Sequence, residues 1–547
     1  MQKRPYLYIT LILCLSLIYS PYAIADFTIS NTVENTTQSL TGNETGTVED
    51  TGTIAVSGDN VLGIEATGNN NIIDNAGTIS SEGDLAYGIS INGDNNTLTN
   101  TGSIFTQGIN VADVFAFGIV TSGAFNMITN EGSISTTSTQ SNGIVASGSN
   151  LSLFNSGSIS TQGFNAFGIF ASGDDAVITN SNSGSISTTQ QDADGIFSTG
   201  DNVTIFNHGT ISTTGDPIGS NSSSGIQSSG EDATINNSGT ITTQGVGAEG
   251  ILSSGINVTI NNSGDISTEG DADANSTASG IETTADNATI NNSGDISVEG
   301  NAARGILATG TNVTINNSSN ISTTGGANGF GSASGIEASS NDAVISNSGA
   351  ISTTGGAADG ILSTGINTTI NNSSTISTAG NSAIGIESTG SGTNIVNDGN
   401  ITTIDTSAHG IFSTGSNSSL INNNSVTTHG SGAMGMESQG NNSTIINNGS
   451  IQTIGNSAIG MYSVGENDLI TNNGSVATSG VSSFGVLSLN ANASITNNGS
   501  ITTSGDSASG AILLANNAEL NNTGNISTTG ENATAIISTG NELTFSN

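Results

Sequence analysis

Large aliphatic residues recur along this chain at three fixed positions of a repeating unit. If the glycine of each Gly-Ile-like pair is taken as position zero, the first is Gly63, the eighteenth is Gly510, and Ala535 fills the nineteenth place. Successive units are 25 residues apart, sometimes 30 and once 27. In the regular unit, isoleucine or a similar residue follows position zero at offsets of one, ten and sixteen residues.

Within each unit, apolar and polar residues alternate in three short segments that glycine or asparagine separates. A period of two is typical of β-strands, and the helical period of 3.6 residues is absent. The pattern therefore predicts three strands and three turns in every unit.

A single unit has too few apolar side chains to offset the conformational entropy lost when 25 residues become ordered. Stacking the units buries like residues on like residues and pairs every strand with the turns above and below it. We therefore predict an all-β fold, a parallel β-helix (β-solenoid) of about 19 turns with three short strands per turn. With about 4.8 Å between turns, the rod would be about 90 Å long. The predicted core stack contains Ile73, Ile205, Ile235, Ile260, Ile290 and Ile315 at one offset, and Ile79, Ile211, Ile241, Ile266 and Ile296 at another.

One asparagine is present in all nineteen units, two residues after the second aliphatic position, as in the recurring phrase TINNSG (234–239, 259–264 and 289–294). Side-chain amides stacked from turn to turn can both donate and accept hydrogen bonds, which predicts a structural asparagine ladder at a corner. An amide array for a ligand is the alternative function of the same residues. The ladder residues are Asn75, Asn100, Asn130, Asn155, Asn180, Asn207, Asn237, Asn262, Asn292, Asn317, Asn347, Asn372, Asn397, Asn422, Asn447, Asn472, Asn497, Asn522 and Asn547.

The five-residue extensions of the longer units fall mostly at one corner, as in GDPIGSNSSSG (215–225) and GGANGFGSASG (325–335). Solenoids often place binding surfaces on such loops, but we favour neutral variation at a tolerant corner as the explanation of the extensions.

The composition excludes several classes of function. The chain has a formal net charge of −40, and Arg304 is its only Lys or Arg after residue 4. Such a surface repels phosphate backbones and anionic lipid, so we expect no nucleic-acid partner. The single cysteine, Cys14, leaves no disulfides or thiolate metal sites in the remainder of the chain.

The first 25 residues have the pattern of a secretory signal peptide, with Lys3 and Arg4 before an apolar run and Ala-Ile-Ala at 23–25. We expect cleavage between Ala25 and Asp26, and no membrane span in the mature chain; an N-terminal anchor is the alternative. Residues 26–50 fit the unit only in part, which predicts an irregular N-terminal cap and a first partial turn. Residues 51–547 are predicted to form the solenoid, which would stop in the middle of a turn without a cap.

No catalytic, cofactor-binding or metal site stands out. His208, His409 and His429 lack ligand spacing, and two of them, His409 and His429, occupy variable slots that are expected to face outward. No carboxylate cluster interrupts the repeat, although the sequence does not exclude a pair of acidic residues in a groove. We expect no cofactor, with Ca²⁺ as a weak alternative that the acidic surface allows.

The phrases NSGAISTTGGAADGI (347–361) and NNGSIQTIGNSAIGM (447–461) resemble the repeats of bacterial autotransporter passenger domains. The resemblance covers about residues 50–547. It implies a right-handed β-helix displayed at, or released from, the surface of a Gram-negative bacterium, commonly for adhesion, aggregation or biofilm formation. The C-terminal translocator barrel of that family has no counterpart here. The resemblance therefore leaves open a separate barrel or end-to-end self-association, and a periplasmic location if the barrel is missing.

We therefore expect a non-enzymatic, exported repeat protein that acts as an adhesin or as an extended structural stalk. Its partner would be a glycan or protein of a host or bacterial surface. A carbohydrate-active enzyme (polysaccharide lyase or hydrolase) on the same scaffold is the first alternative. An ice-binding solenoid is the second, although Glu82, Gln107, Gln162, Glu269 and Ile404 interrupt the threonine array that it would need.

Overall fold

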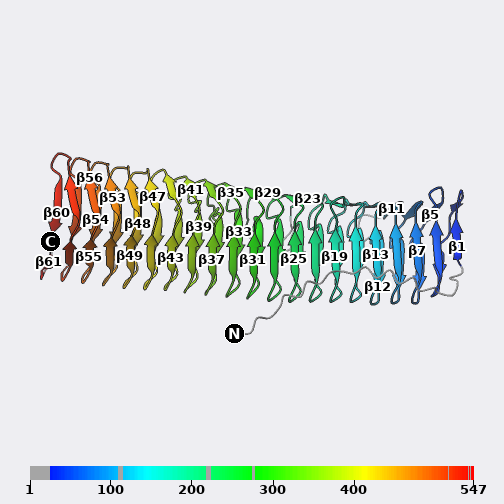
Figure 1. Cartoon of the computed structure of the whole chain (residues 1–547). Helices are drawn as coiled ribbons and strands as arrows, with labels where there is room; N and C mark the ends of the chain where they lie inside the picture. Colours follow the sequence, from blue (N-terminus) through cyan, green and yellow to red (C-terminus); the bar gives the residue numbers. More distant parts are fainter. Residues whose placement is uncertain are drawn as a thin grey trace, which may run out of the picture.

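The chain folds as one long right-handed parallel β-helix without helices among the described residues, as the repeat predicts (Figure 1). The computed structural model describes residues 25–108, 115–216, 223–273, 277–329, 331–514, 516–539, 541–542 and 544–546. Over these residues, no helix is long and apolar enough to span a membrane. The signal peptide and its cleavage after Ala25 stay predictions, because residues 1–24 lie outside the described part.

Three parallel sheets run the length of the rod, and each takes every third strand. Sheet A contains 21 strands, from β1 (Ala25–Ile29) to β61 (Thr544–Ser546). Sheet B runs from β2 (Val33–Glu34) to β59 (Asn525–Thr528), and sheet C from β3 (Gln38–Leu40) to β60 (Thr534–Ser538). A typical turn consists of β28 (Thr259–Asn262), β29 (Ile266–Glu269) and β30 (Ser279–Thr283).

The register confirms that equivalent positions of neighbouring units lie over one another. Ile260 in β28 pairs with Ile290 in β31 (Thr289–Asn292), and Ile266 pairs with Ile296 in β32 (Ile296–Glu299). Because the strand period is two, this register sends the isoleucines of all three strands to the inside.

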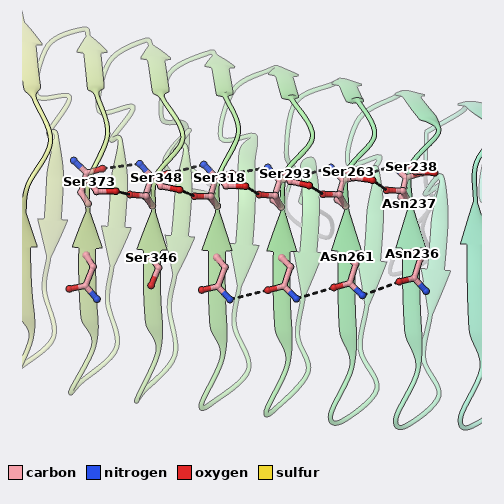
Figure 2. A pocket seen from close by; sticks show the side chains of 18 of the residues that line it. Asn236, Asn237, Ser238, Asn261, Ser263, Ser293, Ser318, Ser346, Ser348 and Ser373 are labelled. Carbon is pink, nitrogen blue, oxygen red and sulfur yellow. Dashed lines mark hydrogen bonds between the residues drawn. The ribbon is translucent and has the colours of Figure 1, made fainter. Parts of the chain in front are cut away.

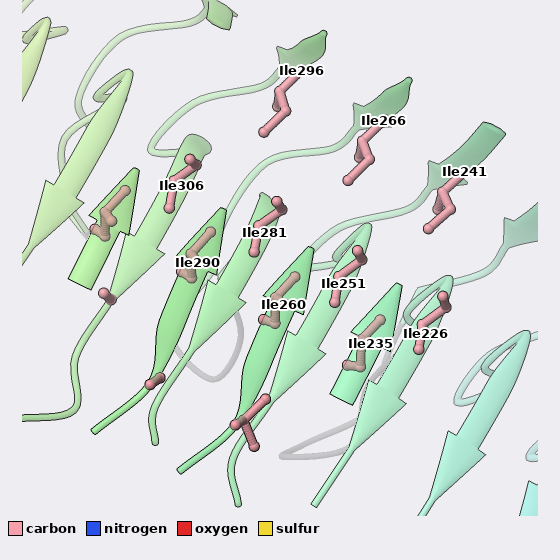
Figure 3. Packing of buried hydrophobic residues seen from close by; sticks show 14 of the residues in the cluster. Ile226, Ile235, Ile241, Ile251, Ile260, Ile266, Ile281, Ile290, Ile296 and Ile306 are labelled. Atoms are coloured by element: carbon pink, nitrogen blue, oxygen red, sulfur yellow. The ribbon is translucent and has the colours of Figure 1, made fainter. Parts of the chain in front are cut away.

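The core is a set of aliphatic columns, one per sheet, as Figure 3 shows for Ile235, Ile260 and Ile290 of sheet A. All of the isoleucines predicted for the core stack are at most 1% exposed. The glycine at position zero is required by this packing. A Cβ on Gly250 would lie 2.4 Å from Cγ2 of Ile266 and 2.4 Å from the carbonyl oxygen of Gly280.

The segment 26–50, expected to be irregular, instead contributes strands to all three sheets. In β1, Phe27 pairs with Gly46 of β4 (Thr45–Val48), and β2 and β3 pair with β5 (Thr53–Ser57) and β6 (Leu62–Thr67). The Phe27 ring occupies the space above Gly46, where an added Cβ would come within 2.4 Å of the ring. The first turn therefore joins all three sheets, with a register shift between Ala25 and Phe27, and the Phe27 ring packs against the core. The sequence pattern does not predict these strands, because this turn lacks the Gly-Ile pair that marks the other units.

Candidate functional site

The predicted asparagine positions form a continuous hydrogen-bonded ladder inside one corner of the rod. From Asn75 to Asn522, each Nδ2 donates to Oδ1 of the next ladder residue over 2.6–2.9 Å. A second bond from many of these amides closes the turn, as from Asn347 to the carbonyl of Gly349 at 2.8 Å. Asn547 lies outside the described residues. These amides are buried and, apart from Oδ1 of Asn75 at the start of the ladder, bonded to one another, so they hold the corner and are not presented to a ligand.

A groove follows the outer side of the same corner, over the strands of sheet A from β22 (Thr204–Asn207) to β43 (Asn394–Asn397). Its volume is about 800 Å³. Phe206 and His208 line one end of it, and Asp398 lines the other. The residues between them are asparagine and serine, so the middle of the groove carries no charge.

Two rows of polar side chains form the walls of this groove (Figure 2). The amides of Asn236, Asn261, Asn291 and Asn316 make a second ladder with links of 2.9 Å. In this ladder each residue donates to the preceding turn, whereas the inner ladder donates to the following one. Opposite them, the row of serines donates to backbone carbonyls of the preceding turn, as from Ser318 to Asn292 at 3.1 Å.

The outer ladder changes its position further along the rod. Ser346 interrupts the first row, and a new ladder begins at Asp398, two residues later in the unit. Its links, 2.7–2.9 Å long, join Asp398, Asn423, Asn448, Asn473 and Asn498. An outward amide surface therefore continues beyond the groove.

The outer face of sheet C carries a different feature, a row with one ionisable side chain in each of eight successive turns. From one turn to the next, these side chains alternate between two positions of the unit: the residue just before the glycine of position zero, and the residue two places after that glycine. This ionisable row consists of Glu249, Glu282, Arg304, Glu337, Asp359, Glu387, His409 and Glu437. The sequence did not suggest it, because successive members of this row never occupy the same position of the unit.

Neighbouring members of the row interact directly. Nε of Arg304 donates to Oε2 of Glu337 over 2.9 Å, and both side chains are buried. Nε2 of His409 lies 3.7 Å from Oε2 of Glu437. Carboxyls of neighbouring turns also come together, as at Asp359 and Glu387, so the expectation that no carboxylate cluster forms is corrected. His409 lies on the outward face of the sheet, but its side chain is only 16% exposed. By contrast, His208 and His429 are exposed.

Described residues beside three of the five-residue insertions contact this row. Three hydroxyls that precede the index glycines contact it: Ser224 at Glu249, Thr277 at Glu282 and Ser332 at Glu337. Asn328 of the last insertion also donates to the carbonyl of Ala272, two turns earlier. The extended corners therefore supply hydrogen bonds to three carboxylates of the row.

Burial shifts the pKa of several side chains in this row. It raises the pKa of the Glu249 carboxyl well above its ordinary value, and the charge of Glu282 raises it further. Burial also raises the pKa of Asp359 well above its ordinary value, with a further contribution from Glu387. For His409, burial lowers the pKa to about 4. Its Nδ1 accepts a bond of 2.8 Å from the Met434 amide, so the neutral ring carries its proton on Nε2, toward Glu437.

Within the described residues, no three His, Cys, Asp or Glu side chains are placed to hold a metal ion. Residues 271–485, which include most of the ionisable row, match a family model described as the third pectate lyase-like domain of BigA. No curated protein and no solved structure is significantly similar to the chain. The match and the fold agree with a repeat-rich bacterial surface β-helix.

Proposed function

We propose that this chain is a non-enzymatic, surface-associated repeat protein that acts in adhesion, with the groove of sheet A as its binding surface. The observation that carries the proposal is the uncharged array of amides and hydroxyls along the groove. Within the outer ladder, Asn261 and Asn291 each use one donor and one acceptor, which leaves one N–H and one lone pair for a partner. A partner with many hydroxyl or amide groups, such as a surface glycan or an extended peptide, would match this repeat.

The resemblance of the repeats to autotransporter passengers supports export to the cell surface. In this proposal the chain is a passenger-like rod whose length places the groove away from the membrane. Fractionation of the producing bacterium tests the location, since the proposal expects the chain in the outer-membrane or culture-medium fraction. Recovery in the periplasm alone would contradict surface display.

Adhesion through the groove is tested by filling it. Asn291→Phe places a ring in a slot that already holds Phe206 in another turn, so the fold should accept it. The control is Thr471→Phe, which makes the same change at the equivalent slot outside the groove. Beads coated with the full chain are scored for attachment to host cells and to other bacterial cells. We expect Asn291→Phe to reduce attachment and the control to leave it unchanged.

A carbohydrate-active enzyme is the second candidate, because Arg304 and the carboxylates around it combine the residue types that polysaccharide cleavage uses. The deciding assay incubates the full chain with neutral and uronic-acid polysaccharides and measures reducing ends and unsaturated products. Activity that disappears in Arg304→Met, while circular dichroism shows an intact fold, would favour the enzyme over the adhesin.

A further inference from the structure

The outer face of sheet C carries a group of aromatic rings toward the N-terminal end, before the ionisable row begins. Phe167 lies 5.2 Å from Phe197 and 5.9 Å from Phe170, measured between ring centroids. On the other side, Phe117 lies 5.2 Å from Tyr87 and 5.8 Å from Phe115. The two aromatic groups come from turns on either side of the turn that contains β15 (Ile144–Ala146).

The middle turn has no aromatic ring at either of its two outward positions. The slot before the glycine, aromatic in Phe117 and Phe167, holds Asn142, and the slot two after the glycine holds Val145, which pairs with Phe170. The result is a notch of about 380 Å³ whose lining includes Val145 and Asn142, with phenylalanines on both sides. Its walls are two turns apart, about 10 Å along the rod axis, which leaves room for one flat, ring-shaped group between them.

Two further amides line the notch. Gln140 and Asn165 occupy successive corners with φ of 54° and 50°, and no hydrogen bond of their side chains occurs within the described residues. The Asn142 amide is buried, and its Oδ1 accepts a bond of 2.8 Å from the Phe167 amide. The notch therefore offers aromatic faces and free amide groups together.

We propose that this notch is a binding site for a neutral sugar ring. The C–H face of a sugar packs on aromatic rings, and side-chain amides can donate to and accept from its hydroxyls. No charged residue lines the notch, and the net charge of −40 disfavours uronic acids and sulfated sugars. A cationic ligand would also favour aromatic faces, but the lining provides no carboxylate for it. The notch lies on a different sheet from the groove, so the proposal does not depend on the adhesin function.

Two substitutions test the notch, and each introduces a residue that occupies the equivalent position in another turn of this chain. Val145→Phe fills the notch with the ring that the next two turns carry as Phe170 and Phe197. Phe170→Leu removes one wall and inserts the residue found at Leu252. The matched control is Leu252→Phe, which adds a ring to the same slot away from the notch.

The labelled full chain is applied to immobilised neutral oligosaccharides of hexoses, deoxyhexoses and N-acetylhexosamines, with uronic-acid oligomers and choline as charged probes. We expect at least one neutral sugar to bind, and Val145→Phe and Phe170→Leu to weaken it about tenfold, the size of a lost aromatic contact. Leu252→Phe should bind as the original chain does. Binding to none of the neutral sugars, binding to choline only, or binding unchanged by both notch variants would overturn the proposal.

Discussion

Arg304 donates from Nε to Oε2 of Glu337, one turn further along the rod, at 2.9 Å, and both side chains are buried. The same guanidinium donates from one terminal nitrogen to the carbonyl of Ala302 at 2.7 Å. Gly331 of the covering insertion lies so close to it that an added Cβ would meet the guanidinium. The only Lys or Arg after residue 4 is thus buried beside the Glu337 carboxylate.

Removing this charge should destabilise the solenoid. In Arg304→Met, Glu337 loses its partner while still buried, and breaking a buried pair from one side costs about 3–5 kcal/mol. The double variant Arg304→Met with Glu337→Gln should recover a large part of that loss, because no unpaired charge remains. Urea unfolding measures both. Equal stability of the single variant and the original chain would mean that the pair does not support the fold.

Stability should fall as pH rises from about 4 toward neutrality. The pKa values of Glu249 and Asp359 are raised in the folded state above 4.5 and 3.8, their ordinary values. As pH passes those ordinary values, the unfolded chain releases protons that the folded chain still holds. The unfolded state is therefore favoured, and below both ordinary values the effect vanishes.

Variants separate this effect from the general repulsion of an acidic chain. Glu249→Gln and Asp359→Asn should flatten the dependence of the urea midpoint on pH between 4 and 7. Glu466→Gln, which removes one exposed carboxylate, should leave the slope almost unchanged. Parallel profiles for all three variants would argue against the buried carboxyls as the cause.

His409 should act in the opposite direction. Its pKa is about 4 in the folded state against an ordinary 6.5. As pH falls below 6.5, the imidazole of the unfolded chain binds a proton while that of the folded chain stays neutral. The free energy of unfolding therefore decreases until pH reaches about 4. The shift corresponds to about 3 kcal/mol at most. His409→Gln should therefore lose less stability between pH 6.5 and 4 than the original chain, as read from thermal unfolding. His429→Gln is the exposed control.

Two adjacent asparagines should differ sharply in their contribution to stability. Asn262 joins Asn237 to Asn292 in the inner ladder, with links of 2.6 and 2.7 Å, whereas Asn261 belongs to the outer ladder. Asn262→Ala leaves buried amide groups on both neighbours without partners, at about 1–3 kcal/mol for each. Asn261 is half-buried on the outer face, where water can replace its ladder bonds, so Asn261→Ala should cost less, about 0.5–1 kcal/mol. Similar losses in urea unfolding would mean that the inner ladder has no special role.

The sequence by itself determined the repeat, the three strands per turn, the aliphatic columns and the position of the inner asparagines. It could do so because a strand period of two and a fixed spacing leave a stacked chain one register that buries every isoleucine, such as Ile260 over Ile290. Only the tertiary structure decided what the outer face of sheet C contains. Arg304 precedes the glycine of position zero by one residue and Glu337 follows it by two, so strict alternation along a strand would place the two side chains on opposite faces. In the folded chain they nevertheless meet on the same face. The burial of both side chains depends on insertions that fold back over other turns. No local sequence pattern specifies which turn an insertion will cover.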